Sequence, residues 1–275
     1  MTMLFMKKKY QLERFFVTWV MILFMILTDA FTAFAQVKQA TALVNGISCD
    51  LEQGILKVEF VTPDVVRVQY TGENTFMGNG TDVCLSRAVD NPVRWVYTPN
   101  PDCYLLKSDS LIVRVDLSTA SITYLDKEGG LLLQEDQNIP RISEKRVTKQ
   151  VIYVEHSKHI EKTADGDKEI KNVLRYDTIG HTWKYRINFK WQPLEALYGW
   201  GAHMEDYMNL RGKELYLCQH NLKAMVPVLN STAGYGLLFD AGCAMMFKDN
   251  SEGSFVELEA AKQIDYYFMK GKTMD

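Results

Sequence analysis

The sequence lacks the cysteine clusters that mark zinc proteins. It has five cysteines in 275 residues, and none of them forms a C-x-x-C pair. A zinc site needs clustered ligands, so we expect no metal, and no motif calls for another cofactor. The scattered cysteines fit best as small buried hydrophobic residues, although an exported protein could oxidise two of them. They are Cys49, Cys84, Cys103, Cys218 and Cys243.

Net charge is also small. The chain carries a formal charge of −3, and its charged residues are interspersed rather than gathered in an acidic or basic tail. Proteins that bind nucleic acid usually present a strongly basic face. We therefore expect no nucleic-acid partner.

The chain has no apolar run long enough to span a bilayer as a helix. Its longest, from Phe15 to Leu27, has 13 residues, against the roughly 20 that a spanning helix needs. Lys7-Lys8-Lys9 and Arg14 precede this run, and Ala33-Phe34-Ala35 follows it with the small residues that signal peptidase recognises. We predict a signal peptide over residues 1–35, cleaved near Gln36. An uncleaved anchor is the alternative.

Export to the periplasm or the cell exterior follows from this leader, with no membrane association after cleavage. No cysteine lies near the predicted cleavage site, which argues against a lipoprotein.

Clean helical periodicity is missing, and alternation of apolar and polar residues takes its place. Leu56, Val58 and Phe60 alternate with Lys57 and Glu59. A turn at residues 62–64 then leads to a second alternating run, residues 66–70. The pair predicts a β-hairpin with one apolar and one wet face. Residues 111–117 repeat the alternating pattern. Two further apolar runs, at residues 122–124 and 131–133, are separated by a turn at residues 126–130.

The clearest strand covers residues 183–191, where five large apolar residues alternate with polar ones. Such a face must pack on something, and a second sheet is the simplest cover. The same aromatics, Trp183, Tyr185 and Trp191, could instead stack on sugar rings, but regular alternation favours burial. We predict an all-β, antiparallel β-sandwich.

A polar segment interrupts this pattern. Residues His156 to Lys171 are rich in Lys, Glu and Asp and are too polar for a core. We expect either an exposed hairpin tip or a mobile insertion there.

Four segments, in this order, carry a family resemblance: Tyr198-Gly199-Trp200-Gly201, Asn209-Leu210-Arg211-Gly212-Lys213, Gly234-Tyr235-Gly236-Leu237-Leu238-Phe239-Asp240, and Asp265-Tyr266-Tyr267-Phe268-Met269-Lys270-Gly271-Lys272-Thr273. With this order and spacing, the chain resembles the N-terminal β-sandwich domain of glycoside hydrolase family 31. That family includes α-glucosidases and α-xylosidases. The resemblance implies a galactose-mutarotase-like sandwich over residues 36–275, ending where the family's catalytic (β/α)8 barrel begins.

The resemblance also implies that the reacting groups lie elsewhere. Retaining hydrolysis needs two carboxyl groups about 5–5.5 Å apart. In the family the nucleophile lies on a barrel strand, in a motif of the form aromatic-x-Asp-Met-Asn, and no such string occurs here. We therefore expect no catalytic residue in this chain and no hydrolase activity of the chain alone.

In the family, one loop of the N-domain reaches the sugar in the first subsite. By motif order that loop falls at Cys218 to Met225 here. Gln219, His220 and Asn221 offer amide and imidazole groups suited to sugar hydroxyls, and we expect them to bind substrate. Alternatively, Gln219 and Asn221 satisfy backbone groups of the loop.

The glycine motif has its own physical reading. Gly199 and Gly201 flank an aromatic residue, which permits positive φ or close backbone approach. Family members usually have Gly-Glu or Gly-Gln after this turn, whereas Ala202-His203 stands here. The residue that normally makes the polar contact at this point is therefore missing, and His203 is the candidate to replace it.

These observations predict the non-catalytic N-terminal domain of an exported α-glycosidase. An α-xylosidase is the first choice and an α-glucosidase the second. The partners would be an α-linked oligosaccharide or glycoside and the catalytic barrel of the same full-length chain. A stand-alone carbohydrate-binding sandwich without hydrolase activity is the alternative, since one fold hosts many functions.

Overall fold

The computed structural model describes residues 36–76, 92–164 and 166–271. The predicted signal peptide over residues 1–35 and the last four residues lie outside this range, as does Cys84. The described residues contain strands but no helix, and hence no helix that could cross a membrane.

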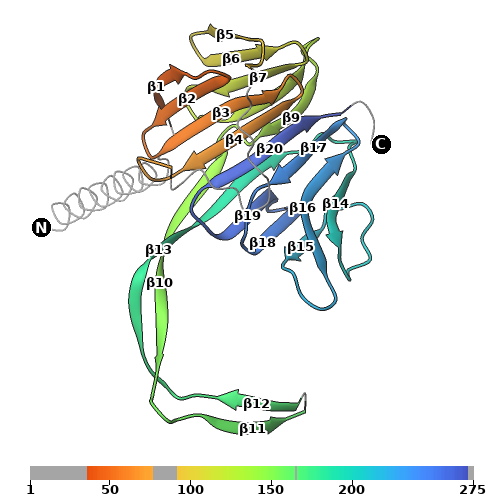
Figure 1. The fold of residues 1–275 in the computed structure, drawn as a ribbon. Helices are drawn as coiled ribbons and strands as arrows, with labels where there is room; N and C mark the ends of the chain where they lie inside the picture. Colours follow the sequence, from red (N-terminus) through yellow and green to blue (C-terminus); the bar gives the residue numbers. More distant parts are fainter. Residues whose placement is uncertain (1–35, 77–91, 165, 272–275) are drawn as a thin grey trace, which may run out of the picture. The chain divides into compact units, whose positions relative to one another are not determined.

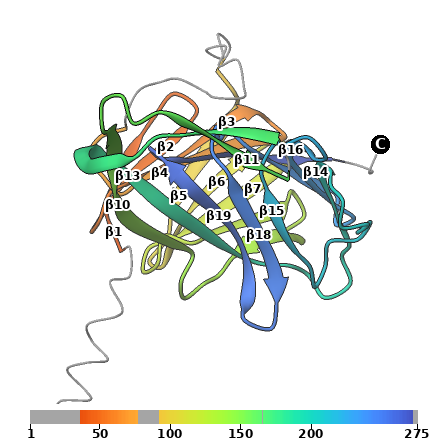
Figure 2. The ribbon, with the colours of Figure 1, turned by 90° about the horizontal axis from the view of Figure 1, so that it is seen from below.

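Two antiparallel sheets contain most of the strands (Figures 1 and 2). The eight-stranded sheet has the order β1 (Val37–Ala42), β2 (Gly46–Leu51), β3 (Ile55–Thr62), β4 (Val65–Thr71), β20 (Ile264–Lys270), β17 (Tyr235–Phe239), β16 (Ala224–Ser231) and β14 (Leu197–Ala202). The ten-stranded sheet has the order β15 (Glu214–Leu217), β18 (Met245–Asn250), β19 (Gly253–Ala261), β13 (Val173–Lys190), β9 (Leu131–Glu135), β8 (Ile122–Asp126), β7 (Leu111–Asp116), β6 (Cys103–Ser108) and β5 (Trp95–Pro99). A further strand, β10 (Arg141–Tyr153), pairs with β13.

The predicted hairpin is β3–β4. Val58 pairs with Val68, and the apolar face is buried while the charged face is partly exposed. The strand predicted at residues 183–191 is the end of β13, where Tyr185, Ile187 and Phe189 are buried. Trp183 is only half-buried, and its indole N–H donates to Glu73 at 3.0 Å. Alternation therefore identified the buried faces correctly.

Aromatic rings of the two sheets meet in the core. Tyr124 of β8 stacks on Phe268 of β20, with ring centroids 4.0 Å apart. Phe189 of β13 meets Tyr266 of β20 edge-on at 6.2 Å. These contacts join the ten-stranded sheet to the eight-stranded one, which confirms the predicted sandwich.

A buried polar cluster also joins the sheets. Glu135 on β9 is fully buried and forms an ion pair with Arg141 on β10. The hydroxyl of Tyr266 donates to Glu135 at 2.9 Å, and the backbone N–H of Ile122 donates at the same distance. Burial raises the pKa of Glu135, while the charge and hydrogen bonds of Arg141 oppose the rise. Every oxygen of this carboxyl group therefore has a partner, as a buried charge requires.

Two of the cysteines are buried, as the sequence predicted. Cys49 and Cys103 are buried, and burial raises the pKa of Cys49 to about 12. That thiol stays neutral near pH 7 and is poorly reactive. Cys218 is half-buried and forms no disulfide with the described residues.

The polar segment forms an exposed hairpin. β11 (His159–Thr163) pairs with β12 (Gly166–Ile170), and nearly all their side chains are exposed. Of the two expectations for residues 156–171, the hairpin tip is confirmed.

The buried ion pair generates a stability prediction. Arg141→Met should lower the free energy of unfolding by about 3–5 kcal/mol, because Glu135 would remain buried without its partner. Arg146→Met is the matched control: Arg146 pairs with Glu144 on the exposed part of β10, and its loss should cost about 1 kcal/mol or less. Urea unfolding followed by fluorescence measures both. Equal losses for the two variants would contradict a special role for the buried pair.

Candidate functional site

The predicted substrate residues lie on the connection between β15 and β16, which we call the 218–223 loop. Gln219, His220 and Asn221 are all exposed there. The loop closes on itself, since the backbone groups of His220 and Lys223 pair at 3.1 and 3.4 Å. The structure thus brings the three predicted residues together on one short turn.

The three side chains differ in their hydrogen bonds. The Gln219 Oε1 accepts the backbone N–H of Met225 at 3.0 Å, and Nδ1 of His220 accepts that of Leu222 at 3.4 Å. Asn221 makes no side-chain hydrogen bond to the part of the chain that the structure describes. Gln219 and His220 therefore shape the loop, and the amide of Asn221 is the group most available to a ligand. Sugar contact by all three stays a prediction.

A second connection is tied to this loop by an ion pair. Lys223 pairs with Glu205, which lies between β14 and β15. This hydrogen bond is the main reason that the pKa of Glu205 lies below its usual range. Nδ1 of His203 lies 3.7 Å from Oε2 of Glu205, an ion-pair distance when the imidazole is protonated. Both atoms are buried and lack a hydrogen-bond partner among the described residues.

Sequence reasoning missed Glu205 and Lys223. They are 18 residues apart, and no periodicity relates them. The pairing of β14 with β16, in which Ala202 lies opposite Ala224, brings their segments together. His203 was considered as a substitute polar contact, and it does lie beside this pair.

The glycine motif turns the chain as expected. Gly199 and Gly201 have φ of 131° and 83°, and Trp200 between them has φ of 64°. The β14–β16 pairing shifts register at this point. The indole of Trp200 is 1% exposed and packs against Phe239 and Phe247. Two permissive glycines therefore let a bulky side chain enter the core at the edge of the sheet.

The Asn209–Lys213 motif anchors the connection that carries Glu205. Oδ1 of Asn209 accepts backbone N–H groups of Leu197 and Arg211 at 3.2 and 3.1 Å. Arg211 donates to Asp249 at 2.9 Å, and to the carbonyl groups of Gln192 and Glu195 at 2.8 and 3.1 Å. These residues fix the backbone around the candidate site.

Exposed apolar side chains lie on the β14–β15 and β15–β16 connections and on the strands next to them. We call them the loop patch: Met204, Met208, Tyr216, Leu222 and Val226. Met208 is 81% exposed, although methionine usually lies in cores or interfaces. These residues lie on the β14–β15 connection, on β15, on the 218–223 loop and on β16.

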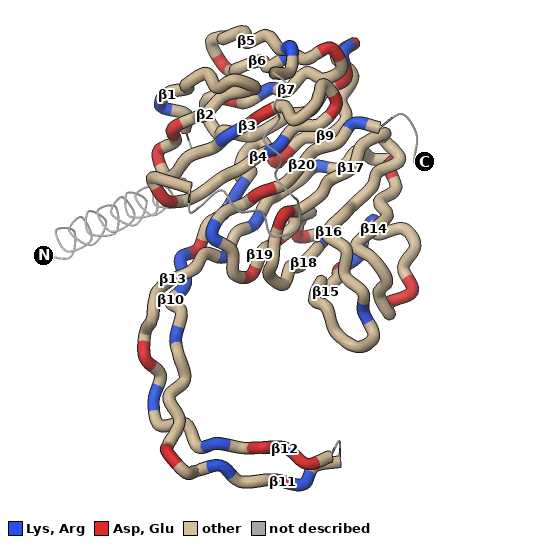
Figure 3. The backbone as a smooth tube through the Cα atoms, in the orientation of Figure 1, with Lys and Arg blue, Asp and Glu red and all other residues tan. Residues whose placement is uncertain are grey.

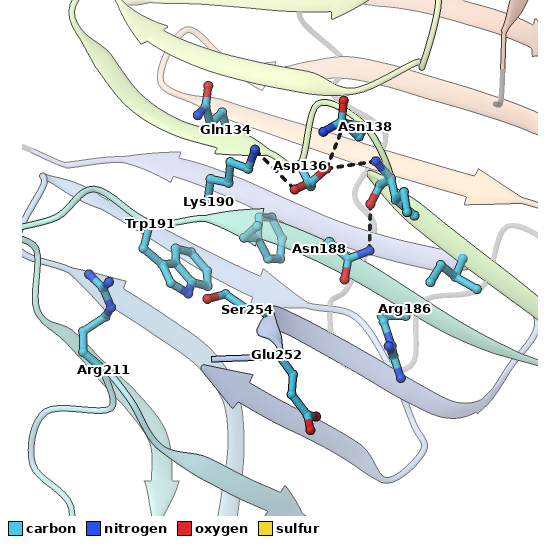
Figure 4. Close-up of a pocket in the computed structure, with 14 residues that line it drawn as sticks. Gln134, Asp136, Asn138, Arg186, Asn188, Lys190, Trp191, Arg211, Glu252 and Ser254 are labelled. Atoms are coloured by element: carbon cyan, nitrogen blue, oxygen red, sulfur yellow. Dashed lines mark hydrogen bonds and ion pairs between the residues drawn. The ribbon is translucent and has the colours of Figure 1, made fainter. Parts of the chain in front are cut away.

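A depression of about 700 Å³ lies elsewhere, on the ten-stranded sheet (Figure 4). It contains none of the predicted site residues. Asp136 in it accepts the N–H groups of Asn138 and Ile139, and Asn188 donates to the carbonyl of Ile139 at 2.7 Å. These polar groups hold the β9–β10 connection in place. Among the described residues, no three His, Cys, Asp or Glu side chains gather as metal ligands.

A family model confirms the resemblance. The glycosyl hydrolase 31 N-terminal galactose mutarotase-like domain matches residues 55–247. The chain belongs to this family, and its fold is the galactose-mutarotase-like sandwich of that domain.

The proteins similar to this chain include α-xylosidases. An α-xylosidase of Saccharolobus solfataricus is 22% identical over 230 residues, which cover 80% of this chain and 26% of that protein. A glycoside hydrolase family 31 dextranase of Flavobacterium johnsoniae, solved with isomaltotriose, has a TM-score of 0.61 at 18% identity, covering 88% of this chain and 27% of that one. A soil-metagenome α-xylosidase solved with xylose has a TM-score of 0.61 at 16% identity, covering 86% and 32%.

These solved structures are similar in fold. The chain spans about a quarter to a third of the length of these three relatives.

The glycine turn can be tested by substitution. Gly201→Ala should destabilise the protein by about 2 kcal/mol or more, because the new Cβ would lie 2.0 Å from the carbonyl oxygen of Ala224 and φ is positive. Gly212→Ala separates the two causes, since its φ of 72° is also positive but no atom lies within 4 Å of its Cβ. It should cost about 1 kcal/mol. Gly180→Ala, with neither feature, should be close to neutral. Urea midpoints in any other order would contradict this explanation.

Proposed function

We propose that this chain is the non-catalytic N-terminal domain of an exported α-glycosidase of family 31, with an α-xylosidase as the first choice and an α-glucosidase as the second. The observation that carries this proposal is the exposure of both the polar residues of the 218–223 loop and the apolar residues of the loop patch, on the loop itself and on neighbouring segments. Exposed polar and apolar side chains on neighbouring segments fit a surface that completes a pocket with another domain.

The neighbour in this proposal is the family's catalytic barrel. Interfaces between domains place apolar side chains at their centre, and Met208, Leu222 and Val226 are exposed around the loop. Once covered by the barrel, these side chains would be removed from water. The domain then has two tasks: it packs on the barrel, and it lends one loop to the sugar site.

In the proposed site, Asn221 binds a sugar hydroxyl, while Gln219 and His220 hold the turn that presents it. The Lys223–Glu205 pair links this turn to the β14–β15 connection. No residue of this chain is proposed as nucleophile or as acid/base. The first choice of substrate, an α-linked xyloside, is supported by two relatives named as α-xylosidases. The second choice, an α-linked glucoside, rests on the family resemblance. Export is supported by the leader-like residues 1–35.

The coding sequence beyond codon 275 provides the first test. An in-frame continuation is expected to encode an aromatic-x-Asp-Met-Asn motif within a few hundred codons. A stop at this point would favour the alternative, a carbohydrate-binding sandwich that works alone.

The role of Asn221 provides a kinetic test in the enzyme that contains this domain and its barrel. Asn221→Ala should lower kcat/KM for an aryl α-xyloside by about 2- to 13-fold, because a neutral hydrogen bond contributes about 0.5–1.5 kcal/mol. Asn172→Ala, at an exposed asparagine beyond β12, is the matched control and should leave kcat/KM unchanged. Equal kinetics for the Asn221 variant and the wild type would refute sugar contact by this side chain.

A further inference from the structure

The connection between β14 and β15 has one partly buried side, which carries Glu205. Along residues 203–208 the side chains alternate: those of His203, Glu205 and Tyr207 are partly buried, whereas those at positions 204, 206 and 208 are exposed. Glutamate side chains are mostly exposed in folded proteins. The burial of Glu205 therefore needs a partner, and Lys223 of the 218–223 loop provides it.

Both ends of this connection are fastened to neighbouring strands. It leaves the sheet at Ala202, which lies opposite Ala224 of β16. It returns at Leu210, whose N–H donates to the carbonyl of Leu197 on β14 at 2.8 Å. A backbone that is held at both ends gives Glu205 a defined position.

The 218–223 loop, in contrast, is held mainly by its own residues. Its backbone closes between His220 and Lys223, and the amide oxygen of Gln219 accepts the N–H of Met225. Among the described residues, the contact of Lys223 with Glu205 is the single hydrogen bond or ion pair that joins this loop to the β14–β15 connection. The position of the loop relative to that connection therefore depends on this pair.

The surroundings of the pair restrict its movement. The side chain of Lys223 is only 14% exposed, although Asn221 and Leu222 beside it are exposed. One oxygen of Glu205 contacts Lys223, and the other lies 3.7 Å from Nδ1 of His203, so the carboxylate has a neighbour on each side. Surface ion pairs are weak because their side chains are mobile and hydrated. Both causes are reduced here.

The position of Lys223 also decides the position of Asn221. The two residues lie in the same closed turn, two positions apart, so a displacement of Lys223 moves Asn221 with it. Hydrogen bonds weaken steeply when their distance or angle departs from the preferred geometry. A displaced turn would therefore present the amide of Asn221 poorly to a ligand.

We propose that Glu205 and Lys223 are positioning residues of the sugar site: their ion pair sets the position of the turn that presents Asn221. The pair thereby controls the affinity for the sugar, not the cleavage of the glycosidic bond. This inference rests on the proposed function, in which Asn221 binds a sugar hydroxyl.

Kinetics of the enzyme that contains this domain and its barrel test the proposal. Glu205→Gln should raise KM for an aryl α-xyloside about two- to fivefold and leave kcat nearly unchanged, because it removes a partly exposed ion pair that acts on binding alone. Glu205→Lys should raise KM further, since it places two ammonium groups together. The charge exchange E205K/K223E restores unlike charges and should bring KM back toward the wild-type value.

The β11–β12 hairpin, which carries both basic and acidic residues (Figure 3), provides the matched control. Glu169 of this hairpin also pairs with a lysine, Lys158, at 2.6 Å, and this hydrogen bond lowers the pKa of Glu169 as Lys223 lowers that of Glu205. Glu169→Gln should leave KM unchanged.

A double variant separates positioning from a general loss of stability. If the pair acts by placing Asn221, it has no effect on binding once Asn221 is replaced by alanine. Glu205→Gln should therefore leave KM nearly unchanged in the Asn221→Ala enzyme.

Hydrogen exchange of the purified chain gives a readout that needs no sugar. Glu205→Gln should speed the exchange of the N–H groups of His220 and Lys223, which close the turn, and Glu169→Gln should not.

The outcomes distinguish this inference from the proposed function. An effect of Asn221→Ala together with an unchanged KM for Glu205→Gln would overturn the positioning role and leave the proposed function in place. Independent, multiplying effects in the double variant would overturn it as well, since the pair would then act elsewhere. Unchanged kinetics for Asn221→Ala would refute the sugar contact and the positioning role with it.

Discussion

The buried contact of Glu135 with Arg141 and Tyr266 is the constraint on which the sandwich depends most. It lies where β9, β10 and β20 approach one another, so it links both sheets at the root of the β10–β13 ribbon. Tyr124 extends it, since its hydroxyl lies 2.8 Å from that of Tyr266. Burying a carboxylate and a guanidinium is costly unless all their groups are paired. Both oxygens of Glu135 have partners, whereas Nε of Arg141 is buried without a hydrogen-bond partner among the described residues. The paired groups hold β9, β10 and β20 together at this point.

Around residues 199–213, the local structure depends on a glycine turn and on a side chain that bonds to the backbone. The Gly199–Gly201 turn inserts Trp200 between Phe239 and Phe247, and Arg211 fastens the next connection to Asp249. These contacts fix the backbone of segments next to the exposed turn at residues 218–223. A scaffold that is rigid beneath a polar, exposed loop suits a domain that presents groups to a ligand.

Much of the fold could be predicted from alternation alone. The β3–β4 hairpin and the buried face of β13 were found because one face of each strand is apolar, and that pattern has a period of two. The ribbon could not be found in this way, since β10 carries Lys145, Arg146 and Lys149 and its outer part has no buried face. Glu135–Arg141 and Glu205–Lys223 were also missed. Glu135 and Arg141 lie six residues apart and Glu205 and Lys223 lie 18 apart, and in neither case does a period in the sequence indicate which charged partner a residue will meet.

The candidate loop was located by family resemblance, not by physical pattern, and the roles of its residues divide in a way that the sequence did not show. Gln219 and His220 bond to the loop backbone, whereas Asn221 remains available. The central proposal is that this chain supplies support and a binding loop while the two reacting carboxyl groups belong to the barrel. The most direct measurement is the release of nitrophenol from aryl α-xyloside and aryl α-glucoside by the purified chain. The proposal predicts a rate equal to that of buffer. A rate well above background that co-purifies with the chain would contradict it.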